Sequence, residues 1–239
     1  LVCADYNAIE ARVLFWLAGD ESGLATYRRG ESPYIEMAQY IFGKPVSKTG
    51  NPREYSIGKG VVLGCGYGLG AAKFQATINA QAGMDVSLEL AEKAVQSYRQ
   101  KYSSVKNLWY SVEAAALNAV KTPGSVQACC GGKAAWAMSR DRRFLVCQLP
   151  SGRFLWYWKP SIKMGPTPWG EKREQLHYAG ENPKTHQWEA LKTYGGALVE
   201  NITQAVARDF MVNGMQKCEA GGFPIIASIH DELLAEIPE

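Results

Sequence analysis

The sequence has few of the features that mark metal cages, disulfide scaffolds and membrane spans. Its six cysteines include no CxxC pair and its histidines number only three, which argues against a zinc cage and a disulfide framework. No apolar run approaches the roughly 18 residues of a membrane-spanning helix, and nothing at the start resembles a signal peptide. We therefore expect reduced thiols, no membrane partner and a cytoplasmic location.

The net charge and the length further restrict the classes of protein to which this sequence can belong. Lys and Arg number 26 against 23 Asp and Glu, so the net charge of +3 does not by itself indicate a nucleic-acid partner, and any basic face has to be local. Apolar residues make up 46% and charged residues 21% of the 239 residues, which is typical of a folded protein of one to two domains. The chain begins with Leu1 rather than Met and ends after an apolar stretch, so we expect an excised segment.

Helical patterns dominate the first half. Apolar residues 1–4 precede Asp5, and residues 9–17 follow at helical spacing, which predicts a strand and then a helix. Asn51-Pro52-Arg53-Glu54 predicts a helix start, with Asn51 as N-cap and Glu54 completing a capping box. Further helices are expected over 32–42, 71–82, 87–101 and 105–121, and Pro123-Gly124 would end the last of them.

The second half changes character. Residues 125–190 are rich in β-branched and aromatic runs, and 144–149 and 154–158 flank a Pro-Ser-Gly turn that predicts a hairpin. A long helix is expected over about 191–218. Strands over 223–229 and 233–237 would then form a hairpin with His230-Asp231-Glu232 at its tip.

Two acidic residues stand at the ends of predicted strands. Asp5 closes one strand and Asp231 lies in a turn between two others, so the two carboxylates converge if these strands share a sheet. Hard oxygen ligands without histidine or thiolate support favour Mg²⁺, which takes its remaining ligands from water and substrate phosphates. The alternative is that Asp5 caps a helix and Asp231 is a turn residue.

A second candidate lies on the glycine-rich helix that starts near Pro52. Tyr55, Lys59, Leu63 and Tyr67 are spaced by four residues and share one face of that helix. A cation, an apolar side chain and an aromatic ring on one face are suited to a nucleoside triphosphate. The alternative is an ordinary core face with a lysine that extends to solvent.

These residues carry a family resemblance. The segments 5–12 (DYNAIEAR), 59–68 (KGVVLGCGYG) and 229–232 (IHDE) resemble motifs A, B and C of family A DNA polymerases, with a phage-like character. The resemblance covers nearly the whole chain and is weakest over 125–190. It implies an α+β right-hand polymerase fold: a palm with an antiparallel sheet backed by helices, mainly helical fingers and a strand-rich insertion.

The resemblance also implies a division of the chain. Residues 1–20 would form the first part of the palm and 192–239 its second part. Residues 21–124 would form the fingers, with the motif B helix near 52–67, and 125–191 the insertion associated with the fingers. The chain starts at motif A and ends just after motif C, so we expect the thumb and exonuclease regions to belong to a longer polymerase.

The metal site follows from the same resemblance. Asp5 and Asp231 would be catalytic and would hold two Mg²⁺ ions, with the Tyr6 carbonyl as a further ligand and Glu232 as an adjacent supporting carboxylate. Lys59 would hold the triphosphate and protonate the leaving pyrophosphate.

The expected dNTP site comprises Tyr6, Glu10, Lys59, Leu63, Tyr67 and Tyr34. Glu10 would crowd the 2′ position of the sugar and exclude ribonucleotides, Leu63 would pack on the sugar, and Tyr67 would stack near the templating base. Tyr34 would stand in for a phosphate-binding side chain. His230 would lie by the primer terminus, Asn201 and Gln204 would face the minor groove of the primer-template DNA, and Arg153 would contact the primer backbone.

Departures from the family pattern are equally specific. The family usually has an arginine four residues before the motif B lysine, where this chain has Tyr55, and Arg53 lies about 160° around the helix from Tyr55. Leu63 stands where an aromatic residue is frequent. We therefore expect altered triphosphate affinity and altered selectivity against sugar analogues.

The resemblance predicts a DNA-directed DNA polymerase in a bacterial cytosol or a phage-infected host cell. The alternatives are a fragment that binds nucleotide or primer-template without turnover, and a relative of single-subunit RNA polymerases, which Glu10 and Glu232 disfavour. The segment 125–190, with Trp156, Trp158 and several arginines, would either add aromatic and basic contacts to DNA or form a solvated hairpin packed on the fingers.

Overall fold

The computed structural model describes residues 1–167 and 170–236, and for residues 81 and 82 the backbone alone. The helices are α1 (Ile9–Ala18), α2 (Glu21–Arg28), α3 (Pro33–Phe42), α4 (Pro52–Cys65), α5 (Ala71–Ala82), α6 (Leu88–Lys101), α7 (Ser103–Lys121), the short 3₁₀ helix η1 (Cys130–Gly132) and α8 (Gly195–Ala220). The strands are β1 (Val2–Asp5), β2 (Val126–Cys129), β3 (Ala134–Met138), β4 (Phe144–Gln148), β5 (Phe154–Pro166), β6 (Lys172–Glu181), β7 (Trp188–Lys192), β8 (Ile225–Ile229) and β9 (Glu232–Ala235).

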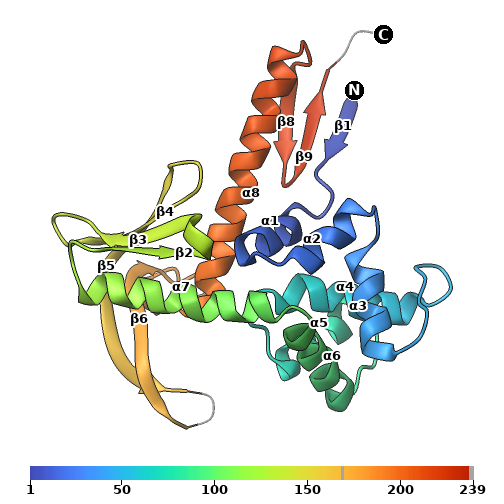
Figure 1. The fold of residues 1–239 in the computed structure, drawn as a ribbon, viewed down its shortest axis with the longest axis horizontal. Coiled ribbons are helices and arrows are strands. Elements are labelled where there is room, and N and C mark those ends of the chain that lie inside the picture. Colours follow the sequence, from blue (N-terminus) through green and yellow to red (C-terminus); the bar gives the residue numbers. More distant parts are fainter. Residues whose placement is uncertain (168–169, 237–239) are drawn as a thin grey trace.

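Two antiparallel sheets divide these strands. The smaller sheet has the order β1-β9-β8, so the first strand of the chain pairs with the last hairpin. The larger sheet, β2 to β7, is a meander in which each strand pairs with the next. Helix α8 connects the two regions: it starts beside the larger sheet and carries the smaller sheet away from the body of the molecule (Figure 1).

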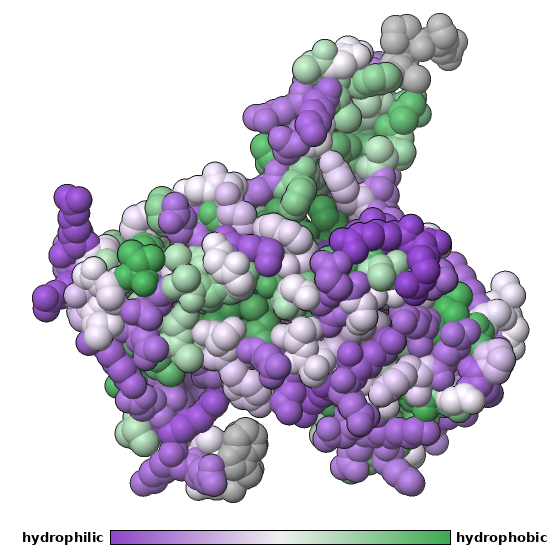
Figure 2. Space-filling view, viewed as in Figure 1, coloured by the Kyte–Doolittle hydropathy of each residue, from purple (hydrophilic) through white to green (hydrophobic). Residues whose placement is uncertain are grey.

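The core lies among the helices and under the larger sheet. Side chains from α1, α3, α4, α6 and α7 form it, including Phe15, Met37, Ile57 and Tyr98. The larger sheet adds Trp136 and Leu145, because β2 to β5 pack on α7. In contrast, the projecting lobe of β1, β8, β9 and the end of α8 leaves hydrophobic residues at the surface, among them Phe223 and Ile226 (Figure 2).

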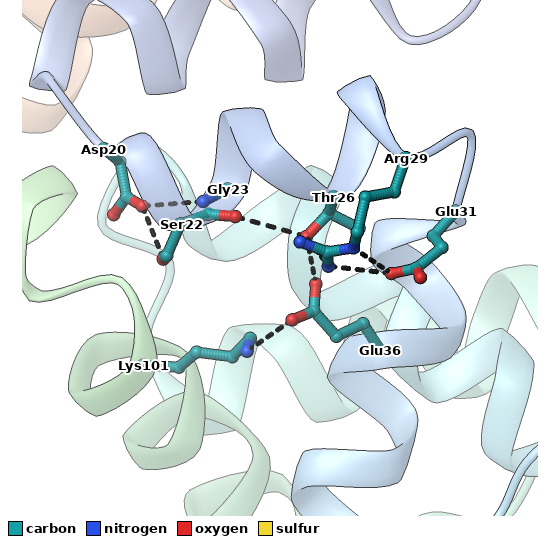
Figure 3. A network of polar contacts seen from close by, with 8 residues as sticks. All are labelled: Asp20, Ser22, Gly23, Thr26, Arg29, Glu31, Glu36 and Lys101. Atoms are coloured by element: carbon teal, nitrogen blue, oxygen red, sulfur yellow. Dashed lines mark hydrogen bonds and ion pairs between the residues drawn. The ribbon is translucent and has the colours of Figure 1, made fainter.

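A polar network holds α3 in place. The Thr26 hydroxyl on α2 donates to Glu36 on α3 (2.6 Å), and the Lys101 ammonium on α6 reaches the other carboxylate oxygen of Glu36 (2.9 Å) (Figure 3). Asp20 caps α2 by accepting from the Gly23 N–H at 2.8 Å, and Ser104 donates to the same carboxylate. Because α3 carries Tyr34, this network fixes one wall of the cleft described below.

The structure matches most of the expected elements and departs from others. The chain forms α2, which the pattern did not predict, and α8 begins at Gly195 because residues 191 and 192 finish β7. Asn51 stands at the N-cap of α4 but makes no side-chain cap, so the expected capping box is wrong: its side-chain oxygen accepts from the Ser47 N–H instead (3.2 Å). The expected last strand ends at residue 235, and residue 237 lies outside the described residues.

The expected division into palm, fingers and insertion stays a prediction. The larger sheet packs on α7, within the range expected for the fingers, and it also contacts α8, within the range expected for the palm. Among the described residues, none of the helices is long and apolar enough to cross a membrane.

Candidate active site

The smaller sheet brings the two acidic strand ends together. In the β1–β9 register Asp5 lies opposite Glu232, and the Tyr6 N–H donates to the Asp231 carbonyl at 3.0 Å. His230 and Asp231 form the two-residue turn between β8 and β9, and His230 has a φ of 54°. Tight hairpin turns favour positive φ, and histidine adopts it more readily than bulkier residues do. The turn therefore places Asp231 beside Asp5.

Helix α1 supplies the next side chain. It begins at Ile9, directly after Ala8, which has a φ of 51°. Ile9, Val13 and Leu14 face the core, and Glu10 in the first turn stays exposed. The apolar spacing of α1 thus orients Glu10 away from the core and toward the cleft.

Helix α4 forms the opposite wall. It buries Ile57 and Val61 and turns Lys59 and Leu63 outward, at the spacing predicted for one helix face. Tyr67 lies just beyond the end of α4, and its hydroxyl donates to a Glu10 carboxylate oxygen at 3.3 Å. This hydrogen bond joins the segment after α4 to α1.

These walls enclose a cleft of about 710 Å³, within the size range of small-molecule sites. The lining residues come from the strand ends, α1, α3, α4 and α8: Asp5, Asn7, Ala8, Ile9, Glu10, Ala11, Tyr34, Lys59, Leu63, Gln204, Ala207, Arg208, Met211, His230 and Asp231. Acidic side chains from the sheet and α1 thus face basic side chains from α4 and α8. Such a site suits a ligand that carries both phosphates and bound cations.

The cleft brings together most of the expected site residues. Of the predicted side chains, Asp5, Glu10, Tyr34, Lys59, Leu63, Gln204, His230 and Asp231 line it. Sequence reasoning missed Arg208 and Asn7. Arg208 follows Gln204 by four residues on α8, so helical spacing was the signal that could have found it.

Other expected residues lie outside the cleft. The Tyr6 side chain lines a separate, mostly apolar cavity of about 360 Å³ with Tyr27 and Phe210, so only the backbone of Tyr6 faces Asp231. Glu232 lies opposite Asp5 in the register but is not among the lining residues. The Tyr6 carbonyl accepts from the Ile9 N–H at 3.3 Å, and its expected role as a metal ligand stays a prediction.

Two expected DNA contacts are engaged within the protein. The Asn201 amide donates to the Tyr157 hydroxyl at 2.9 Å, so it faces the larger sheet. The Arg153 guanidinium pairs with Asp209 at 2.8 Å and donates to the Ala205 carbonyl at the same distance. Both side chains join the larger sheet to α8 in this structure.

The expected arginine of the motif B helix has no obvious substitute. Arg53 donates to the Asp85 carbonyl at 2.8 Å, away from the cleft. Tyr55 packs edge-on against Tyr34, and the Lys48 ammonium lies 6.0 Å from the Tyr55 ring centre. Lys48 is therefore the cation found beside the position where an arginine was expected.

Burial and neighbouring charges shift several acidic groups. Burial raises the pKa of Tyr34, and the nearby Tyr55 and Asp231 add to the shift. Burial also raises the pKa of Glu200, with a contribution from Glu10 that Lys73 partly offsets. Burial and then Glu10 hold the pKa of the Tyr67 phenol far above its usual range, so this hydroxyl remains a hydrogen-bond donor.

The donor set at Asp5 and Asp231 fits a hard divalent cation. Neither carboxylate has an ion-pair partner within residues 1–167 and 170–236, although both face one cleft. In the same part of the chain no group of three or more His, Cys, Asp or Glu side chains is positioned to hold a metal. The protein therefore offers two carboxylates, and a cation there would take its other ligands from water and phosphate.

Comparison with known proteins places this chain in a family. The model of the family described as DNA polymerase family A matches residues 1–136. The DNA polymerase of Bacillus phage SP02 is 34% identical over 239 residues, which is 98% of this chain and 35% of the relative. The thermostable DNA polymerase I of Thermus filiformis is 31% identical over 106 residues, which is 44% of this chain and 12% of the relative.

A solved structure shares the fold. The polymerase domain of Pol1 from M. smegmatis, in complex with DNA primer-template and dNTP, superposes with a TM-score of 0.55 at 20% identity, over 99% of this chain and 33% of that chain. This likeness confirms the expected α+β polymerase fold. The chain spans about a third of the length of the phage relative and of this domain. Because the family model matches more than half of its residues, the chain belongs to DNA polymerase family A.

Proposed function

We propose that this chain carries the catalytic centre of a DNA-directed DNA polymerase, which transfers a nucleotide from a dNTP to a primer 3′ hydroxyl opposite a template. The observation that supports this most directly is the cleft in which Asp5 and Asp231 meet Glu10 and Lys59 from separate elements. The SP02 relative is named a DNA polymerase, and the M. smegmatis domain is described with primer-template and dNTP. The finer assignment of roles rests on the geometry.

Asp5 and Asp231, with the Tyr6 carbonyl, would hold the divalent ions that family A polymerases generally use, here two Mg²⁺. When bound, such ions lower the pKa of an attacking hydroxyl and stabilise the charge of the transferred phosphate. The Tyr6 N–H fixes the Asp231 backbone, so the two carboxylates are held by the sheet rather than by a mobile loop. This preorganisation spares a bound cation the entropic cost of ordering two mobile ligands.

Lys59 would bind the triphosphate as a point charge, and Arg208 would add a second cation from α8. Lys59 is also placed to give a proton to the leaving pyrophosphate. Glu10 would lie against the sugar and exclude a 2′ hydroxyl, while Leu63 would pack on the opposite side of the sugar. Gln204 and His230 would contact the primer-template end of the cleft.

Primer extension tests the proposal. With Mg²⁺, dNTPs and excess primer-template, the chain should extend the primer, and Asp231→Asn should lose turnover by several orders of magnitude while it still binds DNA. Asp85→Asn is the matched control, because Asp85 is exposed and lies outside the cleft. Substantial extension by Asp231→Asn would refute the assigned metal site.

The same experiment separates the alternatives. Binding of primer-template without any extension by the folded, unaltered chain would favour a module that needs further parts of a longer polymerase, such as a thumb. A preference for ribonucleotides would favour a relative of single-subunit RNA polymerases. A location in a bacterial cytosol or a phage-infected host cell stays a prediction.

A further inference from the structure

The two faces of the larger sheet have different surroundings, because one is covered by α7 and the other is not. One face packs on α7 and buries Trp136, Leu145, Cys147 and Tyr157. The other face points away from the core. The second face of such an antiparallel sheet usually carries polar side chains, because it meets water.

Over β2 to β5 this outward face is apolar instead, whereas on β6 and β7 the next pair on the same face is Glu181 and Trp188. Paired residues across the strands form three rows on it: Val126, Ala137, Val146 and Trp156; Ala128, Ala135, Gln148 and Phe154; and Phe144, Trp158, Ala179 and Ala190. Gln148 is the one polar member of these rows. An apolar area of this extent on a folded protein marks a binding surface.

Aromatic rings dominate the outward face. Phe154, Trp156 and Trp158 alternate along β5 and are 41%, 58% and 36% exposed, and Trp188 on β7 is 66% exposed. Phe144 and Trp156 meet at an interplanar angle of 90°, and Trp158 and Trp188 at 85°. Edge-to-face packing holds the rings in place without stacking one on another. Trp156 and Trp188 remain more than half exposed, so part of their ring surface stays open to a ligand.

Charge narrows the choice of ligand. Residues 125–192 hold eleven Lys and Arg against five Asp and Glu, whereas the whole chain holds 26 against 23, so the rest of the molecule has a negative balance. The Lys159 ammonium lies 4.5 Å from the Trp158 ring centre. The Lys159 N–H donates to the Arg143 carbonyl at 2.7 Å, so the two backbones meet beside Trp158. The Arg143 guanidinium pairs with Asp141 at 2.7 Å, which leaves Lys159 as the cation next to the aromatic residues.

The aromatic residues of the outward face are connected to the cleft. Phe154 follows Arg153, which is bound to Asp209 and to the Ala205 carbonyl on α8. On the same stretch of α8, Gln204 and Arg208 line the cleft. The aromatic residues therefore begin at the flank of the active cleft and continue away from it along β5.

We propose that the outward face of the larger sheet binds single-stranded nucleic acid. Bases stack on Phe154, Trp156 and Trp188, while Trp158 packs against Trp188 and Lys159, and Lys159 contacts the phosphates; aromatic stacking with a cationic border is the general mode of binding without sequence preference. A duplex offers no free base faces to these rings. A second copy would bring two segments of positive net charge together, which disfavours self-association.

Binding of a fluorescein-labelled 20-nucleotide oligo(dT) to the full chain tests the proposal by anisotropy, and no turnover is involved. The variant that combines Trp156→Ala and Trp158→Ala should bind at least tenfold more weakly, and the variant with Phe at both positions should retain most of the affinity. Lys159→Ala should weaken binding and flatten its dependence on salt. Photo-crosslinking with a bromouracil oligonucleotide should label the segment 154–158, which distinguishes this face from the cleft.

The results distinguish between single-stranded nucleic acid and a second copy of the chain as the ligand of the outward face. Unchanged oligonucleotide affinity in the double alanine variant, or crosslinks confined to the cleft, would overturn the proposal. A dimer of the unaltered chain that the same variant dissociates, seen by sedimentation, would assign the face to a second copy. The variants should extend a primer over a one-nucleotide template overhang at the unaltered rate, so a failure of the proposed polymerase activity remains distinguishable.

Discussion

Glu10 lies where α1 and the end of α4 meet over the cleft. Its carboxylate accepts a hydrogen bond from the Tyr67 hydroxyl at 3.3 Å, so the position of each side chain depends on the other. Removal of the carboxylate should open space beside the 2′ position of a bound sugar. We expect Glu10→Ala to reduce the preference for dNTP over rNTP by tenfold or more, measured as the ratio of kcat/KM values.

Tyr67→Phe provides the matched control for this prediction. It removes the hydrogen bond but leaves the Glu10 carboxylate in the cleft, so the sugar preference should remain. An unaltered ratio in Glu10→Ala, with the protein still folded, would remove the gate role of Glu10.

Glu113 gives a pH-dependent prediction at the same scale. Burial raises its pKa above the ordinary value of 4.5, although Arg173 at 3.3 Å acts in the opposite direction. The folded state therefore binds this proton more tightly than the unfolded state, and stability is lost as pH rises from about 4.5 through the folded pKa. In melting experiments, Glu113→Gln should gain in Tm relative to the unaltered chain between pH 4 and pH 7. A constant Tm difference would contradict this.

The sequence predicted site residues best where their positions follow from the regular spacing of residues along a helix or from the ends of strands. Lys59 and Leu63 share a helix face, and Asp5 and Asp231 end strands of one sheet, so both sets meet in the cleft as expected. Asn201 was expected beside Gln204, and the two are only about 60° apart around α8, but the hydrogen bond to Tyr157 on the larger sheet turns Asn201 away from the cleft. The engagement of Arg153 by Asp209 depends on tertiary contacts that no local pattern contains.

At the scale of elements, Gly58 controls how closely α3 and α4 approach. A Cβ at Gly58 would clash with the Tyr34 carbonyl and would lie 2.8 Å from the Ala38 side chain. Neither neighbour can move without shifting α3, which carries Tyr34 into the cleft. We expect Gly58→Ala to lower the free energy of unfolding by about 1–3 kcal/mol in urea titrations.

Gly64→Ala is the control on the same helix. Its Cβ would meet only the end of the flexible Leu69 side chain at 2.8 Å, and alanine favours helix by up to about 1 kcal/mol over glycine. Gly64→Ala should therefore be neutral or stabilising. Equal destabilisation by both substitutions would show that the α3–α4 contact is not the cause.

Element boundaries were predictable where capping residues dominate. Ser32 caps α3 and Ser87 caps α6 through side-chain hydrogen bonds, at the ends that the sequence indicated. The helix α2 was not predicted because Ser22 and Gly23 have low helix propensity. Its stability comes from the Asp20 cap and from the network through Glu36, which only the folded molecule contains.

At the scale of the whole molecule, the strength with which the larger sheet is attached to α8 can be measured. Arg153 and Ser151 both bind the Asp209 carboxylate, at 2.8 and 2.6 Å. The Arg153 side chain is 48% exposed and that of Asp209 21%, so solvent reduces the strength of the pair. A double-mutant cycle of Arg153→Ala and Asp209→Ala should give a coupling of about 0.5–1 kcal/mol. A coupling of zero, with weaker DNA binding in Arg153→Ala, would instead favour the expected primer contact.

Helix α8 links α1, the smaller sheet and the larger sheet. Its 26 residues extend about 39 Å, and it packs on α1, α7 and β8 and bonds the larger sheet through residues 201, 205 and 209. One residue inserted into it would rotate all that follows by about 100° and separate Asp231 from Asp5. Insertions and deletions among related chains should therefore collect in the turn over 182–187, whereas the length of α8 should be inherited unchanged.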